Sequence, residues 1–222
     1  MTLKFIDLYN EVAGQAWSMF DPDAESKEDF ESAMKISINK ALSYLWNYQD
    51  WTFRFAKKTT RTKPNVAEYS LPNGTLVRKT IEGVERYGVK YNGQYLAYEP
   101  SYELLDEDFG EPESFYISGD KYYLYPTPDS SYVINLAYLK MSSVLSSEME
   151  QKYELVEDDD YIDIPEKYEA IFKNCLISLS MMYAIAEETD ENYSAYKKQY
   201  EDALSVLTKY CKDSVANKNI VW

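Results

Sequence analysis

The acidic run over residues 158–163 is the first place where side chains of this sequence could do chemistry. It carries four carboxylates in close succession, on Asp158, Asp159, Asp160 and Asp163. Their oxygens would suit a hard divalent cation, but a calcium loop spaces its ligands at alternate positions around a glycine and ends on a glutamate. This run contains no glycine. We therefore predict a solvated acidic segment here, and no metal site.

A second acidic stretch comes closer to the spacing of a calcium loop. Asp21, Asp23 and Glu25 alternate as the first three ligands of such a loop would. However, Ser26 takes the place of the glycine, and Ser32 takes the place of the final glutamate. The sequence therefore predicts a solvated loop here as well, and no metal cofactor.

The segment from Gly83 to Gly88 has the glycine spacing of a phosphate-binding loop. A true loop of that kind continues with a lysine and then a serine or threonine, which reach the phosphates and magnesium. Here Val89 and Lys90 follow, so the lysine is displaced and the hydroxyl is missing. The prediction is that both glycines belong to a β segment.

Histidine is absent from the sequence. Its absence excludes Ser-His-Asp and Cys-His nucleophilic centres, zinc sites that need imidazole, and histidine general bases. Carboxylate pairs could still hydrolyse glycosides, but among 38 acidic residues some pair will meet the required separation by chance. No residue stands out as catalytic, and we expect neither an enzyme nor a bound cofactor.

The chain is strongly acidic, with 38 acidic residues against 23 basic ones and a net charge of −15. Tight nucleic-acid binders neutralise phosphates with lysine and arginine, so a DNA-binding surface is not expected. The acidity would let DNA pass without binding, although solubility alone also explains it. No apolar run is long enough to span a bilayer, and residues 1–10 lack the pattern of a signal peptide.

Both cysteines, Cys175 and Cys211, fall on predicted apolar helix faces. The prediction is two buried thiols in a reducing cytoplasm. A disulfide between them would require the two helices to pack side by side, with Cα atoms within about 7 Å.

Helical periodicity marks both ends of the chain. Apolar residues recur every three or four positions over residues 3–20 and 26–48, and the second stretch opens on an approximate capping box, Ser26 to Asp29. Helix resumes at Pro165, which suits a first helical turn, and again at Thr189-Asp190. These helices are amphipathic, so they need one another to cover their apolar stripes.

Strand and turn signals fill the middle of the chain. Asn92-Gly93 favours a two-residue hairpin turn. Residues 111–138 predict a three-stranded meander, with a turn at Gly119-Asp120 and prolines after the second strand that remove ladder donors. The acidic segment 150–164 is expected to add one strand that closes the sheet.

These elements predict an α+β fold. The N-terminal helix pair (residues 1–50) and the C-terminal pair with its tail (residues 165–222) would form a four-helix bundle. A mostly antiparallel β domain (residues 51–164) would be inserted between them.

Several motifs, taken in order, resemble one known family. Trp51-Thr52-Phe53 precedes the strands, Tyr69-Ser70-Leu71-Pro72 forms a turn, the meander of 111–138 follows, and Ile164-Pro165-Glu166-Lys167-Tyr168 restarts the helix. In this succession the chain resembles the head-to-tail adaptor proteins of tailed bacteriophages, the connector rings of short-tailed phages that include the ring proteins of crAss-like phages. Tyr122-Tyr123 departs from the more aliphatic strand start expected there.

The resemblance implies a structural protein of the virion, made in the host cytoplasm and placed at the head-to-tail interface. Copies would form a homo-oligomeric ring, expected to be dodecameric, that binds the portal protein and the tail or further ring proteins. DNA would pass through its channel without specific binding. The apolar C-terminal tip, Ile220, Val221 and Trp222, would dock into the portal.

Two features leave alternatives open. The most basic segment, residues 54–63, carries Arg54, Lys57, Lys58, Arg61 and Lys63. It could contact an acidic neighbouring subunit, with Arg54, Lys57, Lys58 and Arg61 as the contact residues, or it could be a solvated edge strand protected by its lysines. The 23 tyrosines suit half-wet protein interfaces. They would also suit a carbohydrate-binding β module of a phage or bacterial surface protein.

Overall fold

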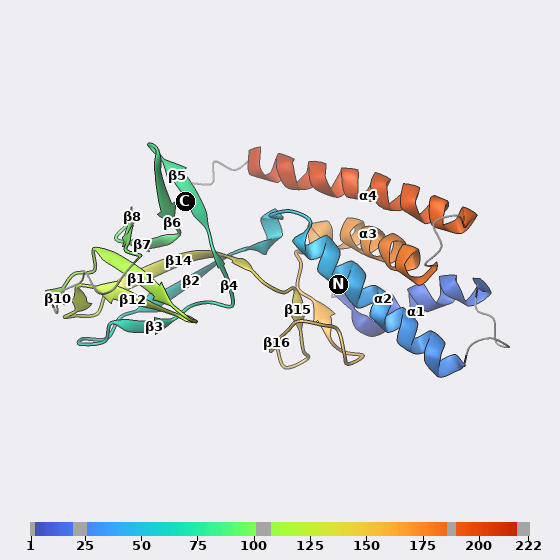
Figure 1. The fold of residues 1–222 in the computed structure, drawn as a ribbon, viewed down its shortest axis with the longest axis horizontal. Helices are drawn as coiled ribbons and strands as arrows, with labels where there is room; N and C mark the ends of the chain where they lie inside the picture. Colours follow the sequence, from blue (N-terminus) through green and yellow to red (C-terminus); the bar gives the residue numbers. More distant parts are fainter. Residues whose placement is uncertain (1–2, 20–25, 101–107, 186–189, 217–222) are drawn as a thin grey trace. The chain divides into compact units, whose positions relative to one another are not determined.

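The computed structural model describes residues 3–19, 26–100, 108–185 and 190–216, and its fold is α+β as predicted (Figure 1). The chain forms two compact units. The helical unit draws on Met1–Phe53 and Ser142–Trp222, and the β unit on Arg54–Met141. Helices from the two ends of the chain therefore flank a β-rich insert.

The helical unit contains α1 (Phe5–Ala16), α2 (Lys27–Asn47), α3 (Glu166–Ile185) and α4 (Glu191–Ala216), with short 3₁₀ turns at Trp17–Met19 and Thr52–Arg54. The helix start predicted at Ser26 is confirmed, because the Asp29 N–H donates to Ser26 Oγ at 3.1 Å, and that hydroxyl donates in turn to the Asp29 carboxylate at 2.7 Å. At the start of α4 the Asn192 N–H donates to the Asp190 carboxylate at 2.6 Å. These bonds satisfy N–H groups that have no acceptor within the helix.

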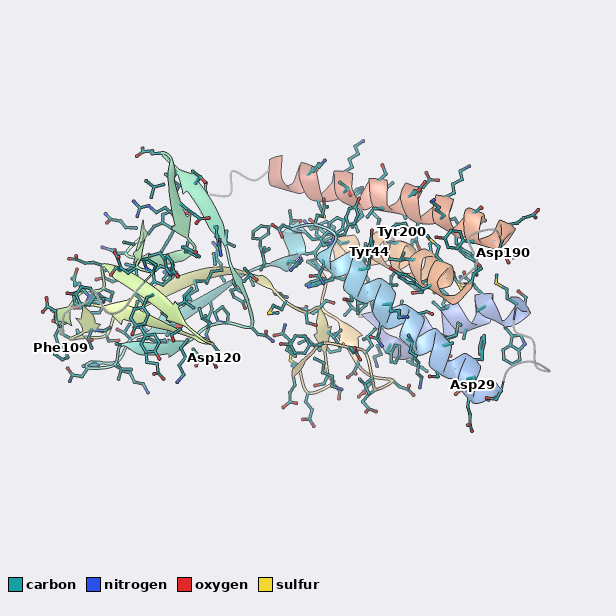
Figure 2. All side chains as sticks on the ribbon, in the orientation of Figure 1. Asp29, Tyr44, Phe109, Asp120, Asp190 and Tyr200 are labelled. Atoms are coloured by element: carbon teal, nitrogen blue, oxygen red, sulfur yellow. The ribbon has the colours of Figure 1, made fainter. Side chains whose placement is uncertain are left out.

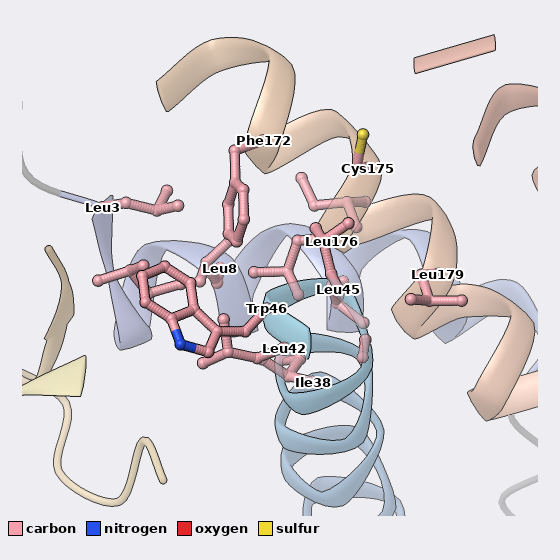
Figure 3. Packing of buried hydrophobic residues seen from close by; sticks show 14 of the residues in the cluster. Leu3, Leu8, Ile38, Leu42, Leu45, Trp46, Phe172, Cys175, Leu176 and Leu179 are labelled. Carbon is pink, nitrogen blue, oxygen red and sulfur yellow. The ribbon is translucent and has the colours of Figure 1, made fainter. Parts of the chain in front are cut away.

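The core of the helical unit surrounds α3, which packs against α1, α2 and α4. Figure 3 shows apolar side chains of α1, α2 and α3 meeting there. The fully buried positions include Leu8, Ile38, Leu45, Phe172 and Leu176. Each such side chain stabilises the fold by about 1.5–3 kcal/mol relative to an exposed one, so the amphipathic stripes predicted from sequence are what holds this unit together.

The chain stretches that flank the insert also meet in this core. Trp51 is fully buried and its indole N–H donates to the carbonyl of Leu45 at 2.7 Å. Phe53 stacks on Trp51 with ring centroids 5.7 Å apart and meets Phe172 edge-on at 5.8 Å. Phe53 also lies 5.2 Å from the ring of Tyr168, whose hydroxyl is 3.0 Å from Thr52 Oγ1.

A small antiparallel sheet belongs to the helical unit. Its order is β1 (Leu3–Lys4), β17 (Tyr161–Ile162), β15 (Val144–Leu145) and β16 (Gln151–Lys152). The segment 150–164, expected to close the sheet of the β domain, thus pairs with the N-terminus instead. The reason is apolar burial, since Leu3, Val144 and Ile162 join the helical core.

The β unit contains two main sheets. One has β2 (Phe55–Arg61), β14 (Val133–Lys140), β7 (Val89–Tyr91) and β8 (Gln94–Tyr95) in that order, with β4 (Gly74–Leu76) also paired to β14. The other has the order β3 (Glu68–Ser70), β12 (Lys121–Tyr125), β11 (Ser114–Ser118) and β9 (Ala97–Tyr98). Two short pairs, β5 (Arg78–Ile81) with β6 (Val84–Tyr87) and β10 (Phe109–Gly110) with β13 (Thr127–Pro128), complete it.

The predicted meander is correct for its hairpin and wrong for its third strand. β11 and β12 pair through the turn at Gly119, which has φ +62°. β14, by contrast, belongs to the other sheet, where it pairs with β2, β4 and β7. Its buried residues Ile134 and Leu136 join Phe115 and Leu124 of the hairpin in one apolar cluster. Burial therefore places the two sheets against each other instead of joining them edge to edge.

The glycines of the Gly83–Gly88 segment have structural roles, which confirms their assignment to a β segment. Glu82 and Gly83, with φ of 52° and 81°, form the β5–β6 turn. A side chain at Gly88 would place its Cβ 2.7 Å from the carbonyl oxygen of Ala137. The hairpin turn predicted at Asn92-Gly93 is confirmed, with both residues at positive φ between β7 and β8.

Candidate interaction surfaces

The acidic run at 158–163 has a structural role in this fold. Asp160 is fully buried, and its carboxylate accepts hydrogen bonds from the Val156 and Glu157 N–H groups at 2.8 and 2.9 Å and from Lys152 Nζ at 2.7 Å. Burial acts to raise the pKa of Asp160, but the Lys152 ammonium and the two N–H groups outweigh it, so the pKa lies below its ordinary value. Asp160 is therefore an ionised anchor for the loop around it.

The backbone of the same run holds the start of α1. The N–H groups of Phe5 and Ile6 donate to the carbonyls of Asp160 and Asp158 at 2.8 and 3.2 Å. First-turn N–H groups have no acceptor within their own helix. Across the part of the chain that the structure describes, no group of three or more His, Cys, Asp or Glu residues is arranged to hold a metal ion.

Beside this anchor the chain presents a surface that we call the acidic knob. It consists of three strongly exposed apolar or aromatic residues, Met149, Tyr153 and Val156, and the exposed carboxylates around them on Glu148, Glu150, Glu154, Glu157, Asp158 and Asp159. The side chains of Met149, Tyr153 and Val156 are 73%, 68% and 59% exposed. All three residues lie within the short stretch 149–156, and exposed apolar side chains close to one another are typical of protein-interaction sites.

Hydrogen bonds to the backbone fix the position of the acidic knob. Leu155 is buried between Tyr153 and Val156, and its N–H and carbonyl are bound by the side-chain amide of Asn39 on α2 at 2.8 and 2.9 Å. In the β15–β16 hairpin, Ser146 bonds through its backbone to Met149 and Glu150 at 2.9 and 2.8 Å. The exposed side chains therefore project from a fixed backbone, which lowers the entropy lost on binding.

A second surface lies where α4 passes the end of α2, and we call it the tyrosine groove. It has a volume of about 550 Å³ and is lined by Tyr48, Glu201, Leu204, Ser205, Thr208, Lys209 and Lys212. Tyr44, whose ring centroid is 6.1 Å from that of Tyr48, continues the aromatic surface, and both side chains are about half exposed.

Tyr200 of α4 lies beneath this surface, and Figure 2 shows it close to Tyr44 of α2. Its side chain is only 8% exposed, and its hydroxyl has no hydrogen-bond partner among the described residues. Burial, followed by the neighbouring Tyr44, Cys175 and Tyr48, raises the pKa of Tyr200. The groove itself therefore combines the aromatic ring of Tyr48 and the apolar side chain of Leu204 with one carboxylate, Glu201, and two lysines, Lys209 and Lys212.

The basic segment does not form a single patch. Lys57 and Arg61 alternate on the exposed face of β2, which forms one end of its sheet and pairs with β14. Lys58 lies on the opposite face and donates to the carbonyl of Ser70 at 3.2 Å, and Arg54 Nε donates to the carbonyl of Lys140 at 3.3 Å. A contact with another subunit through Lys57 and Arg61 stays a prediction, as does protection of the strand edge by charge.

The predicted docking residues Ile220, Val221 and Trp222 lie outside the described residues. The prediction of buried thiols is confirmed, because Cys175 and Cys211 are both buried. Burial raises the pKa of the Cys175 thiol to about 12, and burial also raises the pKa of Cys211.

One aromatic pair bears on sugar stacking. Tyr116 and Tyr123 stack on each other with ring centroids 4.7 Å apart and ring planes within 4° of parallel. The Tyr123 hydroxyl donates to Glu68 at 3.0 Å. One face of each ring is therefore already covered within the β unit.

Neither the acidic knob nor the tyrosine groove was predicted from the sequence. The knob has a sequence signal, because Met149, Tyr153 and Val156 alternate with acids at spacings of four and three residues outside any helix. The groove has none, because it depends on how α4 lies against α2.

The comparison with protein families supports a phage adaptor protein, the coarser part of the sequence resemblance. Within the described residues, no helix is both long and apolar enough to cross a bilayer. No curated protein sequence matches the chain. The family model of the SU10 adaptor protein, however, matches residues 5–219, which include both helix pairs and the β insert. The chain therefore belongs to the SU10 adaptor protein family.

Proposed function

We propose that this chain is a structural protein of a tailed-phage virion, a head-to-tail adaptor whose copies form a ring between portal and tail. The observation that carries the proposal is the family match over residues 5–219. The ring is expected to be dodecameric and to surround the channel through which DNA leaves the head. In this role the protein has no substrate, and its work is to hold other chains together.

The arrangement of the core supports a mechanical role. Trp51 and Phe53 precede the insert and stack on each other, and Phe53 also packs against Tyr168 and Phe172 of α3, which follows the insert. The two chain stretches that connect the insert to the helical unit are thus held together by packed aromatic rings. A protein that transmits load between portal and tail needs attachment points of this kind.

The charge of the chain supports passage of DNA. The chain has a net charge of −15. Acidic side chains that face the channel would repel the phosphates of DNA, so DNA would slide past without lasting contact. The contacts with neighbours would include Arg54, Lys57, Lys58 and Arg61, and the tail Ile220, Val221 and Trp222 would dock on the portal protein.

The test is assembly with the portal protein of the same phage. The purified chain should add to portal rings as a ring of its own, observed by electron microscopy and by mass measurement, and it should be found in purified virions. A chain that ends at Ala216 should bind the portal more weakly if the tail docks there. The proposal fails if the full chain neither binds the portal nor occurs in virions.

A further inference from the structure

The acidic knob and the tyrosine groove lie on opposite sides of the helical unit. Figure 1 shows the β15–β16 hairpin, which carries the acidic knob, on one side of α2 and α3, and α4 on the other. We propose that the acidic knob of one copy binds in the tyrosine groove of the next copy. This inference rests on the proposed function, because it specifies the contact that joins neighbouring copies of the proposed ring.

The acidic knob has the composition of a surface made to be covered. Met149, Tyr153 and Val156 have the largest exposed fractions among the exposed large hydrophobic residues of the described chain. Met149 also adopts a positive φ of 64°, which is uncommon for a residue other than glycine. A fixed turn that holds an apolar side chain in water gains nothing in the isolated chain, whereas burial against a partner recovers the hydrophobic contribution.

The tyrosine groove is lined by two lysines and one carboxylate, Glu201, so its charge is complementary to the acidic knob at the end where the lysines lie. Lys209 and Lys212 stand at the C-terminal end of its α4 wall, where they would meet the carboxylates that surround Tyr153 and Val156. Leu204 and the ring of Tyr48 offer apolar contact area for those two side chains. Tyrosine tolerates a partly wet interface, so Tyr44 and Tyr48 suit a position at its rim.

The same charges decide how the copies are arranged. Two copies that met knob to knob would bring many carboxylates together, and like charges disfavour such a contact. A knob-to-groove contact joins two different surfaces, so it is heterologous and leaves one knob and one groove free on every pair. Contacts of this type add further copies until the rotation closes a ring.

Charge reversal tests the contact. The groove variant is Lys209→Glu with Lys212→Glu, and the knob variant is Glu154→Lys with Glu157→Lys. Each should raise the protein concentration needed for ring assembly on the portal protein by at least about tenfold. The chain with all four changes should recover most of that loss, because the signs are again complementary. Lys197→Glu with Lys198→Glu is the matched control, since both lysines are exposed on α4 but do not line the groove.

Cross-linking tests the same contact without changing charges. Tyr153→Cys and Thr208→Cys in one chain should allow a short bifunctional maleimide to join neighbouring copies in portal-bound rings. Each single variant alone should give no ladder of linked copies, because Cys175 and Cys211 are buried.

The outcomes separate this contact from the function on which it rests. Portal-bound rings that form equally well with either reversed variant, or a fourfold variant that recovers nothing while its circular dichroism is native, would overturn the knob-to-groove contact and leave the adaptor ring standing. If the wild-type chain binds the portal protein only as single copies, the proposed ring fails and this contact fails with it.

Discussion

Phe53 and Tyr168 lie in contact, with ring centroids 5.2 Å apart, although more than a hundred residues separate them in the sequence. Phe53 closes the aromatic motif before the insert, and Tyr168 belongs to the Ile-Pro motif that restarts the helix after it. Two motifs of the family resemblance are therefore the two halves of one packing contact. Their order along the chain reflects where an insert leaves the helical core and returns to it.

Phe53→Ala should lower the free energy of unfolding by about 3 kcal/mol, because it leaves a cavity between Trp51, Tyr168 and Phe172. Phe109→Ala makes the same chemical change at a side chain that is 58% exposed, and it should cost about 0.5 kcal/mol or less. Urea unfolding followed by circular dichroism measures both. If both variants lowered the free energy of unfolding by the same amount, Phe53 would not be packed in the core as described.

Asp160→Asn should lower the free energy of unfolding by about 1–3 kcal/mol at pH 7, because the Lys152 ammonium and two N–H groups lose their carboxylate. The effect depends on pH. The pKa of Asp160 is lower in the folded chain than its ordinary value of 3.8, so its contribution is present above about pH 4 and is lost as the pH falls through the folded-state pKa.

Urea unfolding of the wild type and Asp160→Asn at pH 7 and near pH 3 should therefore show a difference that narrows in acid. The control is Asp159→Asn, because Asp159 is an exposed neighbour and its replacement should change stability little at either pH. A difference between wild type and Asp160→Asn that widened in acid would contradict the ionised, hydrogen-bonded state of this carboxylate.

Tyr200→Phe should leave stability unchanged or raise it by up to about 1 kcal/mol. Its buried hydroxyl has no hydrogen-bond partner among the described residues, and an unpaired buried polar group costs free energy. Removing a hydroxyl that is hydrogen-bonded has the opposite effect. Thermal unfolding followed by circular dichroism distinguishes the two, and a clear loss of stability would show that Tyr200 is bonded in solution.

Gly88→Ala should destabilise the β unit by about 1–3 kcal/mol, because the added Cβ would meet the backbone of Ala137 at 2.7 Å. Gly14→Ala is the counterpart. Gly14 is exposed within α1, and no atom lies within 4 Å of an added Cβ, so alanine should stabilise the helix by about 0.5–1 kcal/mol. Changes of the same sign at both glycines, measured by chemical denaturation, would speak against this placement of Gly88.

Cys175 and Cys211 should react with Ellman's reagent only after unfolding. Burial raises the pKa of Cys175 to about 12 and also raises that of Cys211, and the thiolate is the reactive form. The native protein at pH 8 should therefore release almost no chromophore, while the protein in guanidinium chloride should release two equivalents, one for each cysteine. Rapid labelling of the native chain would contradict the burial of these thiols.

Local signals predicted the parts of this fold that depend on local chemistry. Ser26 with Asp29, Pro165 and Asp190 each mark a helix start that the structure contains, and Asn92-Gly93 marks a hairpin turn. These residues act through their own backbone conformation or through hydrogen bonds a few positions away. Such effects can be inferred from spacing alone.

Some of the missed features depend on partners far away in the sequence. The strand at Tyr161–Ile162 pairs with Leu3–Lys4, and the residues next to either segment do not indicate which strand it will pair with. The turn at Glu82-Gly83 was not predicted from the sequence, because the residue before the glycine is a glutamate, which rarely adopts a positive φ. The tyrosine groove depends on helix packing, whereas the spacing of Met149, Tyr153 and Val156 could have indicated the acidic knob.

The strands that open and close the insert are neighbours, since β2 pairs with β14 and Phe55 lies opposite Leu139. The chain thus leaves toward the insert and comes back at one place, as it does in proteins that tolerate domain insertion. The residues between these two positions could be replaced during evolution while the sequences of the helices stay unchanged. Adaptors with the same helical unit could in this way carry different inserts, and chimaeric chains joined at Phe55 and Leu139 would test whether the insert can be exchanged.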